Sequence, residues 1–77
     1  MIKVTQTRIE YYDSSKRLHC DMAPAVFHCD GTKEYYCHGK RHRTVGYAVV
    51  KPDGTGEYWL NGVKVTKSEH YVYTQSN

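Results

Sequence analysis

The sequence predicts a mainly β protein, an antiparallel meander of about five to seven short strands built from repeated β-hairpins. The first observation behind this prediction is that the chain matches itself at an offset of 23 residues. The second is that each copy contains dipeptides typical of tight turns, such as Asp-Gly and Asn-Gly. The third is that 8 tyrosines stand beside one Trp and one Phe, because tyrosine favours strands and half-exposed surfaces.

Length and composition limit the chain to a single domain over residues 1–77. A chain of 77 residues with 25% charged residues and a net charge of +3 is ordinary for a small globular domain. No apolar run approaches the ~20 residues of a membrane span, and the first residues lack the apolar stretch of a signal peptide. We therefore expect no membrane contact, free thiols on the three cysteines and a reducing cytoplasm.

The repeat divides the chain into units. Repeat one covers residues 17–39, repeat two covers 40–62, a degenerate half-repeat covers 8–17, and a C-terminal tail covers 66–77. Nine of 23 positions are identical between the two full repeats: His19/His42, Ala25/Ala48, Val26/Val49, Asp30/Asp53, Gly31/Gly54, Thr32/Thr55, Glu34/Glu57, Tyr35/Tyr58 and Gly39/Gly62. Units this short bury their apolar face only by stacking on their neighbours.

The turn residues set the strand register. Pro52-Asp53-Gly54 predicts a three-residue hairpin loop with a glycine bulge, and Asn61-Gly62 predicts a two-residue type I′ turn. His38-Gly39 is a weaker copy of the second turn. A type I′ turn at Asn61-Gly62 places Trp59 opposite Lys64.

The C-terminal tail allows two interpretations. Thr66 and Glu69 have the spacing of a capping box, which predicts a short helix. The alternation of Tyr71, Val72 and Tyr73 instead fits a last strand over residues 70–74. We favour the helix.

The predicted register assigns the side chains to two faces of the sheet. The expected core face holds Ile9, Tyr11, Ala25, Phe27, Tyr35, Cys37, Ala48, Val50, Tyr58, Leu60, Val63 and Val65. The expected outer face holds Val26, His28, Glu34, Tyr36, Arg41, Arg43, Val49, Lys51, Glu57, Trp59 and Lys64. Glu34 is expected opposite Arg43 as a cross-strand ion pair.

Histidines and cysteines are dense between residues 19 and 42, but their spacing argues against a metal site. Cys29 falls in a turn and Cys37 at the far end of the next strand, about 15 Å away at ~3.3 Å per residue. That separation excludes a shared ion. His19 and His42 occupy equivalent repeat positions, which indicates a structural role. We predict no metal and no cofactor.

The sequence also predicts no catalytic residues. The only adjacent candidates for an acid, base or nucleophile are His19 with Cys20, and His28 with Asp30. Neighbours along a strand point to opposite faces, and a sheet of two repeats leaves little room for a ligand-sized cleft. We therefore expect that the chain is not an enzyme.

The repeat unit resembles one found in small proteins of tailed bacteriophages and giant viruses. The shared pattern is Ala-Val-x-x-x-Asp-Gly-Thr-x-Glu-Tyr-Trp-Leu-Asn-Gly followed by Lys/Arg-x-His-Arg, and it covers residues 17–66. The segment 59–66 is its most specific part. The unit is also similar in plan to hairpin repeats of the MORN kind. The resemblance implies a viral accessory protein in the host cytoplasm, and it supplies no catalytic residues.

An outer face rich in aromatic and basic residues points to a binding function. The residues expected to bind a partner are Tyr36, Arg41, Arg43, Lys51, Trp59 and Lys64. Trp, Tyr and Arg are the residue types enriched at protein-interface hot spots, so we expect that the protein binds and inhibits a host protein. The alternative is a nucleic-acid-binding module that uses the same cations and rings. The oligomeric state stays open.

Overall fold

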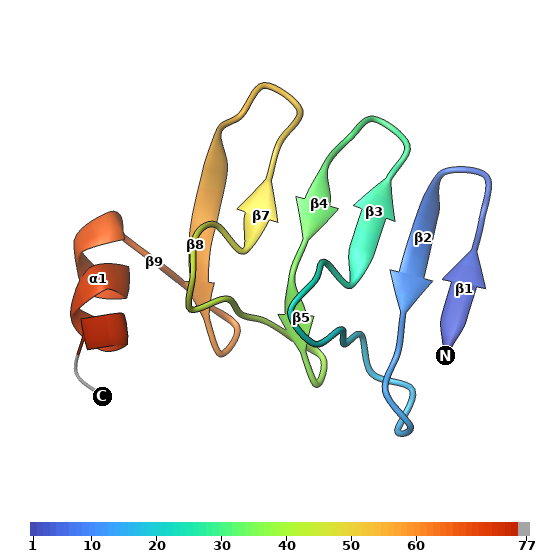
Figure 1. The fold of residues 1–77 in the computed structure, drawn as a ribbon, viewed down its shortest axis with the longest axis horizontal. Helices are drawn as coiled ribbons and strands as arrows, with labels where there is room; N and C mark the ends of the chain where they lie inside the picture. Colours follow the sequence, from blue (N-terminus) through green and yellow to red (C-terminus); the bar gives the residue numbers. More distant parts are fainter. Residues whose placement is uncertain (76–77) are drawn as a thin grey trace.

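The computed structural model describes residues 1–75 as antiparallel hairpins followed by one helix (Figure 1). The strands are β1 (Ile2–Val4), β2 (Arg8–Tyr11), β3 (Val26–His28), β4 (Lys33–Glu34), β5 (Tyr36–Cys37), β6 (Lys40–Arg41), β7 (Val49–Val50), β8 (Gly56–Leu60) and β9 (Val63–Val65), and the helix is α1 (Lys67–Gln75). The predicted mainly β fold with a C-terminal helix is confirmed. No helix within residues 1–75 is long and apolar enough to span a membrane.

Seven strands form one sheet in the order β1-β2-β3-β4-β7-β8-β9, and β5 pairs with β6 separately. The nine strands exceed the expected five to seven, and one of the additional strands arises because Tyr35 interrupts the strand that β4 and β5 would otherwise form. The Tyr35 N–H donates to the Ala48 carbonyl at 2.7 Å, whereas the Tyr35 carbonyl accepts from the His42 N–H at 3.1 Å. The strand thus changes partners at this residue.

Three hairpins lie side by side in Figure 1, formed by β1–β2, β3–β4 and β7–β8. The sequence placed the start of the half-repeat at residue 8, but the first hairpin already begins at Ile2. Residues 2–7 together with the start of the half-repeat therefore form a complete hairpin. Its β1 strand has no recognisable counterpart in the repeat pattern, which is why the sequence comparison missed it.

The turn predictions are confirmed. Asn61 and Gly62 have φ values of 51° and 84°, as a type I′ turn requires, and His38 and Gly39 have 48° and 88°. In the β7–β8 hairpin the Lys51 N–H donates to the Thr55 carbonyl at 2.8 Å. Trp59 pairs with Lys64, as the turn predicted.

The helix of the tail is confirmed, and the last-strand alternative is wrong. The Thr66 N–H donates to Glu69 Oε1 at 2.8 Å and the Glu69 N–H donates to Thr66 Oγ1 at 3.1 Å, which is a reciprocal capping box. The helix packs on the sheet through His70, whose ring centroid lies 4.6 Å from that of Tyr58. His70 Nε2 also lies 2.7 Å from the Arg43 carbonyl oxygen.

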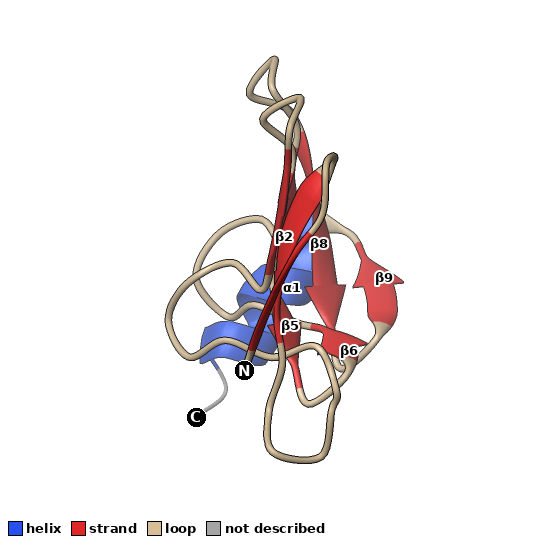
Figure 2. Ribbon diagram, turned by 90° about the vertical axis from the view of Figure 1, so that its right-hand side faces the viewer, coloured by secondary structure: helices blue, strands red, loops and turns tan. Residues whose placement is uncertain are grey.

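The two faces of the sheet have different covers, as the edge-on view in Figure 2 shows. Helix α1 lies on one face, which we call the helix face. Strands β6 and β9 bend toward the other face, which we call the ladder face. Tyr58 belongs to the helix face because it contacts His70, so the next residue, Trp59, belongs to the ladder face.

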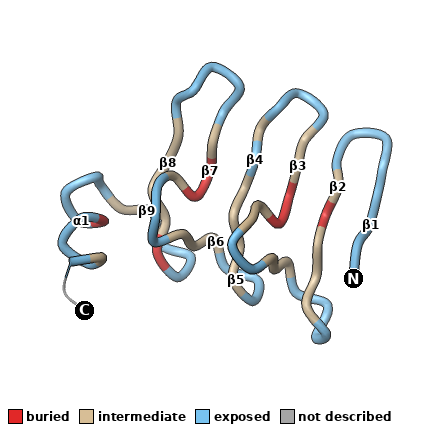
Figure 3. The backbone as a smooth tube through the Cα atoms, viewed as in Figure 1, coloured by how far each residue is buried: buried red, intermediate tan, exposed pale blue. Residues whose placement is uncertain are grey.

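The core is thin and lies on both faces rather than on one. The buried apolar residues are Ala25, Val26, Ala48, Val49 and Leu60 (Figure 3). The expectation that Val26 and Val49 are exposed on the outer face is wrong, because they are only 3% and 7% exposed. Val63 was expected in the core but is 62% exposed, since β9 is an edge strand and no strand of residues 1–75 lies on its far side.

Candidate functional site

The ladder face repeats one local motif in all three units, a glutamate followed two residues later by an aromatic side chain. Residues i and i+2 of a strand lie on the same face, so the aromatic group reaches back to the carboxylate. The three hydrogen bonds are Tyr12 Oη to Glu10 Oε1, Tyr36 Oη to Glu34 Oε1 at 3.0 Å, and Trp59 Nε1 to Glu57 Oε1 at 2.9 Å. Each unit therefore fixes its aromatic ring through its own glutamate.

Each of these rings has a cross-strand partner, and successive partners are 23 residues apart along the chain. Tyr12 pairs with Leu18, Tyr36 with Arg41, and Trp59 with Lys64. We call these six residues the aromatic ladder. Strands lie about 4.8 Å apart, so successive rings follow one another across the sheet at intervals of about 10 Å.

Arg41 connects two rings of the ladder. Its Cζ atom lies 5.0 Å from the centroid of the Trp59 ring and 5.9 Å from that of the Tyr36 ring. Its Nε and Nη2 atoms donate to Glu34 Oε1 at 3.1 and 2.9 Å. The predicted binding residues Tyr36, Arg41 and Trp59 are therefore brought together, and the hydrogen bonds to Glu34 fix the position of the Arg41 guanidinium.

Glu34 is the electrostatic centre of this arrangement, and its side chain is 12% exposed. Burial alone would raise the pKa of Glu34, but hydrogen bonds from His28, Arg41 and Tyr36 outweigh it and lower the pKa. Burial and the hydrogen bond to Glu34 raise the pKa of the Tyr36 hydroxyl. The expected ion pair of Glu34 with Arg43 is wrong, since Arg41 takes that place.

The cations of the ladder face are neutralised by its carboxylates. Arg8 Nε lies 2.6 Å from Glu10 Oε2, and Lys64 Nζ lies 3.6 Å from Glu57 Oε2. The Trp59 indole N–H and, less strongly, Lys64 lower the pKa of Glu57, so this carboxylate stays charged. The net charge of the ladder face is therefore close to zero, although the side chains that the sequence predicted there are mainly aromatic and basic.

Two of the residues expected to bind a partner lie elsewhere. Arg43 lies on the helix face, where its Cζ atom is 3.8 Å from the centroid of the Tyr35 ring. The alternation that placed Arg43 beside Arg41 fails because β6 ends at Arg41. Lys51 is exposed at the turn between β7 and β8, at the opposite end of that hairpin from Trp59.

Sequence reasoning missed Tyr12, Leu18 and the role of the three glutamates. The signal was present, because Glu-x-aromatic occurs at Glu10, Glu34 and Glu57. It was not recognised because an acidic residue in a strand is ordinarily taken as a solvated side chain. Glu10 is in fact 4% exposed.

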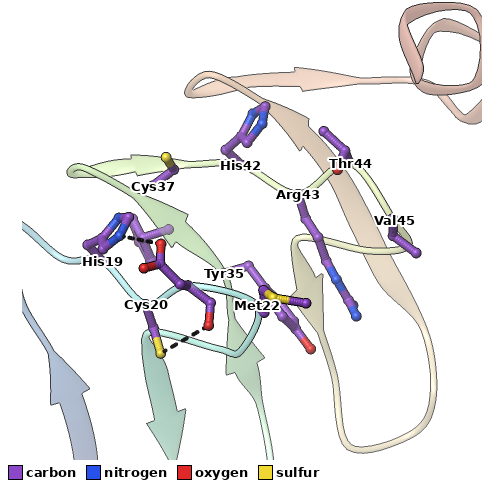
Figure 4. A pocket seen from close by; sticks show the side chains of 11 residues that line it. His19, Cys20, Met22, Tyr35, Cys37, His42, Arg43, Thr44 and Val45 are labelled. Atoms are coloured by element: carbon purple, nitrogen blue, oxygen red, sulfur yellow. Dashed lines mark hydrogen bonds and ion pairs between the residues drawn. The ribbon is translucent and has the colours of Figure 1, made fainter. Parts of the chain in front are cut away.

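A cavity of about 490 Å³ lies on the helix face, between the chain segments that follow residues 19 and 42 (Figure 4). Its lining includes His19, Met22, Tyr35, His42, Arg43 and Val45. Arg43 extends toward Met22 and Tyr35 in Figure 4. The expectation that the sheet leaves little room for a ligand-sized cleft is wrong, because much of the cavity wall comes from the segments 19–22 and 42–45, which lie outside regular secondary structure, although β5 also contributes to it.

The predicted structural role of His19 and His42 is confirmed. His19 Nδ1 accepts a hydrogen bond from the His38 backbone N–H at 3.0 Å, and His42 Nδ1 accepts one from the Asn61 N–H at 2.9 Å. Each histidine thus holds the hairpin turn of its own repeat, 19 residues further along the chain. Burial, with a smaller contribution from His70, lowers the pKa of His42.

The donor atoms of His19, Cys37 and His38 lie within 4.8 Å of one another, which raises the question of a metal ion. His19 Nδ1 uses its lone pair for the His38 N–H, so Nε2 carries the proton and donates to Asp21 Oδ1 at 2.8 Å. The His19 and His38 rings are stacked with an interplanar angle of 13°, so their lone pairs run parallel and do not converge on one point. The arrangement fits hydrogen bonding better than tetrahedral zinc.

His38 also connects the half-repeat to repeat one. Its Nδ1 lies 2.8 Å from Asp13 Oδ2, and the Arg17 Nε atom lies 3.0 Å from the same oxygen. The hydrogen bond with His38, followed by that from the Arg17 backbone, holds the pKa of Asp13 far below its usual range. This cluster is a charged link between units.

Comparison of the chain with protein-family models, with curated proteins and with solved structures found no match.

Proposed function

We propose that the chain is a small viral accessory protein that binds a host protein through the aromatic ladder and inhibits it in the host cytoplasm, as a means of host takeover or of blocking a defence. The viral origin rests on the resemblance of the repeat unit. The observation that carries the binding proposal is the group of Tyr36, Arg41 and Trp59, three half-exposed side chains of hot-spot type in which Arg41 lies against both rings.

The ladder is suited to protein binding because it is fixed before a partner arrives. Glu34 and Glu57 hold Arg41 and Trp59 in one geometry through hydrogen bonds. Immobilising a flexible side chain at an interface costs about 0.5–1.5 kcal/mol, and here that cost is largely met during folding. A partner can therefore gain most of the contact energy of these rings.

Nucleic-acid binding has less support from the same geometry. A nucleic-acid surface needs free cations for phosphates and free ring faces for bases. Arg41 is paired with Glu34 and contacts the rings of Tyr36 and Trp59, and Lys64 is paired with Glu57. Arg41 therefore competes with bases for stacking on these rings.

The test is affinity capture from host lysate with three forms of the protein: wild type, Trp59→Ala and Tyr71→Ala. Tyr71 is 64% exposed on α1 and serves as the matched aromatic control. A captured protein is then purified, its affinity is measured with each form, and its activity is assayed with and without the wild type. Loss of a central interface tryptophan costs about 2 kcal/mol or more, about 30-fold in affinity.

We expect Tyr71→Ala to bind like wild type and Trp59→Ala to bind at least about 30-fold more weakly. Circular dichroism at the assay temperature establishes that both variants are folded. Equal affinity of the two folded variants contradicts the ladder as the binding face. If the wild-type protein does not change the activity of the captured target, the inhibitory role is contradicted, but the binding role is not.

A further inference from the structure

Arg43 differs from the other arginines of the chain in having no carboxylate partner among residues 1–75. The other three arginines pair with acids: Arg8 with Glu10, Arg17 with Asp13 and Arg41 with Glu34. The contacts of Arg43 are with neutral groups. Its Nη1 donates to the Tyr47 carbonyl oxygen at 3.0 Å, and its Cζ lies over the Tyr35 ring. Its charge is therefore not compensated within the described chain.

This guanidinium lies at the wall of the cavity on the helix face. The cavity of about 490 Å³ falls in the size range of small-molecule sites, roughly 300–1,000 Å³. Met22 and Val45 form apolar parts of its rim and are 103% and 76% exposed. Exposed apolar residues beside an uncompensated cation suit a ligand that is apolar at one end and negatively charged at the other.

We propose that this cavity binds an organic anion, a carboxylate carried on an apolar body, with Arg43 as its anchor. Nη1 is engaged by Tyr47, while Nε and Nη2 make no hydrogen bond with residues 1–75. These two atoms form one edge of the planar guanidinium and match the two oxygens of a carboxylate. The apolar body then lies along Met22 and Val45.

One acidic group also faces the cavity and limits where the anion can bind. Asp21 belongs to the lining, and its Oδ1 lies 2.8 Å from His19 Nε2. Its side chain is 89% exposed, so water screens much of its charge. The carboxylate of the ligand is therefore expected at the Arg43 end of the cavity, away from Asp21. The cavity shares Tyr36 with the aromatic ladder, whereas its proposed anchor Arg43 and the apolar residues Met22 and Val45 do not belong to the ladder.

The experiment uses 2-naphthoate as the probe and 2-naphthamide, its uncharged analogue, as the control ligand. Binding is followed by NMR titration of the isotope-labelled full chain. We expect saturable shifts at residues around Arg43 with naphthoate and much weaker ones with naphthamide. Arg43→Gln removes the charged donor and should weaken naphthoate binding about tenfold or more. Arg17→Gln is the control, because it removes an arginine outside the cavity.

A second pair of variants decides the question if Arg43→Gln does not fold. Val45→Glu places a negative charge at the exposed rim, and Val45→Gln has the same shape without the charge. Repulsion should make Val45→Glu bind naphthoate more weakly than Val45→Gln, while naphthamide binding is the same in both. The proposal is overturned by the absence of saturable binding, by equal affinity for naphthoate and naphthamide, or by equal naphthoate binding in the two Val45 variants.

Discussion

At the scale of single residues, the histidines show how strongly context decides chemistry. His19 and His42 have the side chain most often found at metal centres, yet each uses Nδ1 to accept a backbone N–H from the turn of its own repeat. An imidazole that accepts at Nδ1 must stay neutral, because protonation converts that acceptor into a donor. For His42, whose pKa is lowered by burial, this hydrogen bond makes the fold sensitive to acid.

We predict that His42 makes the protein less stable as the pH falls. Its pKa in the folded state is below the value of about 6.5 for an unfolded chain, so the unfolded state binds more protons near that pH. The stabilisation is present above about pH 6.5 and is lost as the pH falls through the folded-state pKa. Thermal melts at neutral and mildly acidic pH measure it.

The matched variant for this test is His42→Asn, whose side-chain oxygen can still accept from the Asn61 N–H but does not titrate. Its melting temperature should fall less between neutral and mildly acidic pH than that of wild type. An identical fall in both proteins means that His42 is not responsible for the acid sensitivity.

At the scale of elements, turns fix the pairing of the short strands, and a capping box fixes the start of the helix. Positive φ values at Asn61 and Gly62 fix the β8–β9 register, and this register alone pairs Trp59 with Lys64. Helix α1 begins with the reciprocal bonds of Thr66 and Glu69 and places His70 on Tyr58. A helix of 9 residues is too short to be stable alone, so it depends on both its cap and this contact.

We predict that Thr66→Ala lowers the stability of the whole domain. The substitution removes the acceptor for the Glu69 N–H, and loss of such a cap typically costs about 1 kcal/mol. For a domain of this size that corresponds to a decrease in melting temperature of about 4–8 °C. Differential scanning calorimetry measures it.

Thr74→Ala is the control for the cap, because within residues 1–75 Thr74 Oγ1 bonds only to the Tyr71 carbonyl in the last turn. It should change the melting temperature much less than Thr66→Ala. Equal effects of the two substitutions are incompatible with a specific role of the cap.

At the scale of the whole molecule, the distribution of charge matters more than its total. The net charge of +3 and the aromatic content are compatible with nucleic-acid binding. The fold places Glu10, Glu34 and Glu57 beneath the cations of the ladder face and neutralises them. Few cations are left free on that face to replace the counterions of a polyanion.

We predict weak retention of wild-type protein on heparin, with elution below about 0.2 M NaCl because few phosphate-like contacts are available. The variant Glu34→Gln with Glu57→Gln frees Arg41 and Lys64 and should elute at higher salt. Retention of wild type to much higher salt, with no change in the double variant, contradicts the neutralised ladder face and favours nucleic acid as the partner.

The local parts of this structure were determined by the sequence. The glycine turns, the register of β8 with β9, and the helix cap depend on residues within a few positions of one another, so their chemistry can be interpreted without knowledge of the fold. The repeat placed Tyr36 and Trp59 at equivalent positions, because the same local pattern occurs in both units. Both rings lie on the ladder face.

The tertiary structure alone decided which groups meet between repeats. Arg43 crosses to the helix face because β6 ends two residues earlier, and nothing in the local sequence marks that end. The burial of Glu10 and the cavity beside Arg43 arise from side chains and loops of adjacent units. Such contacts depend on how one hairpin packs against the next. They join residues that are distant in the sequence, so the local sequence pattern does not reveal them.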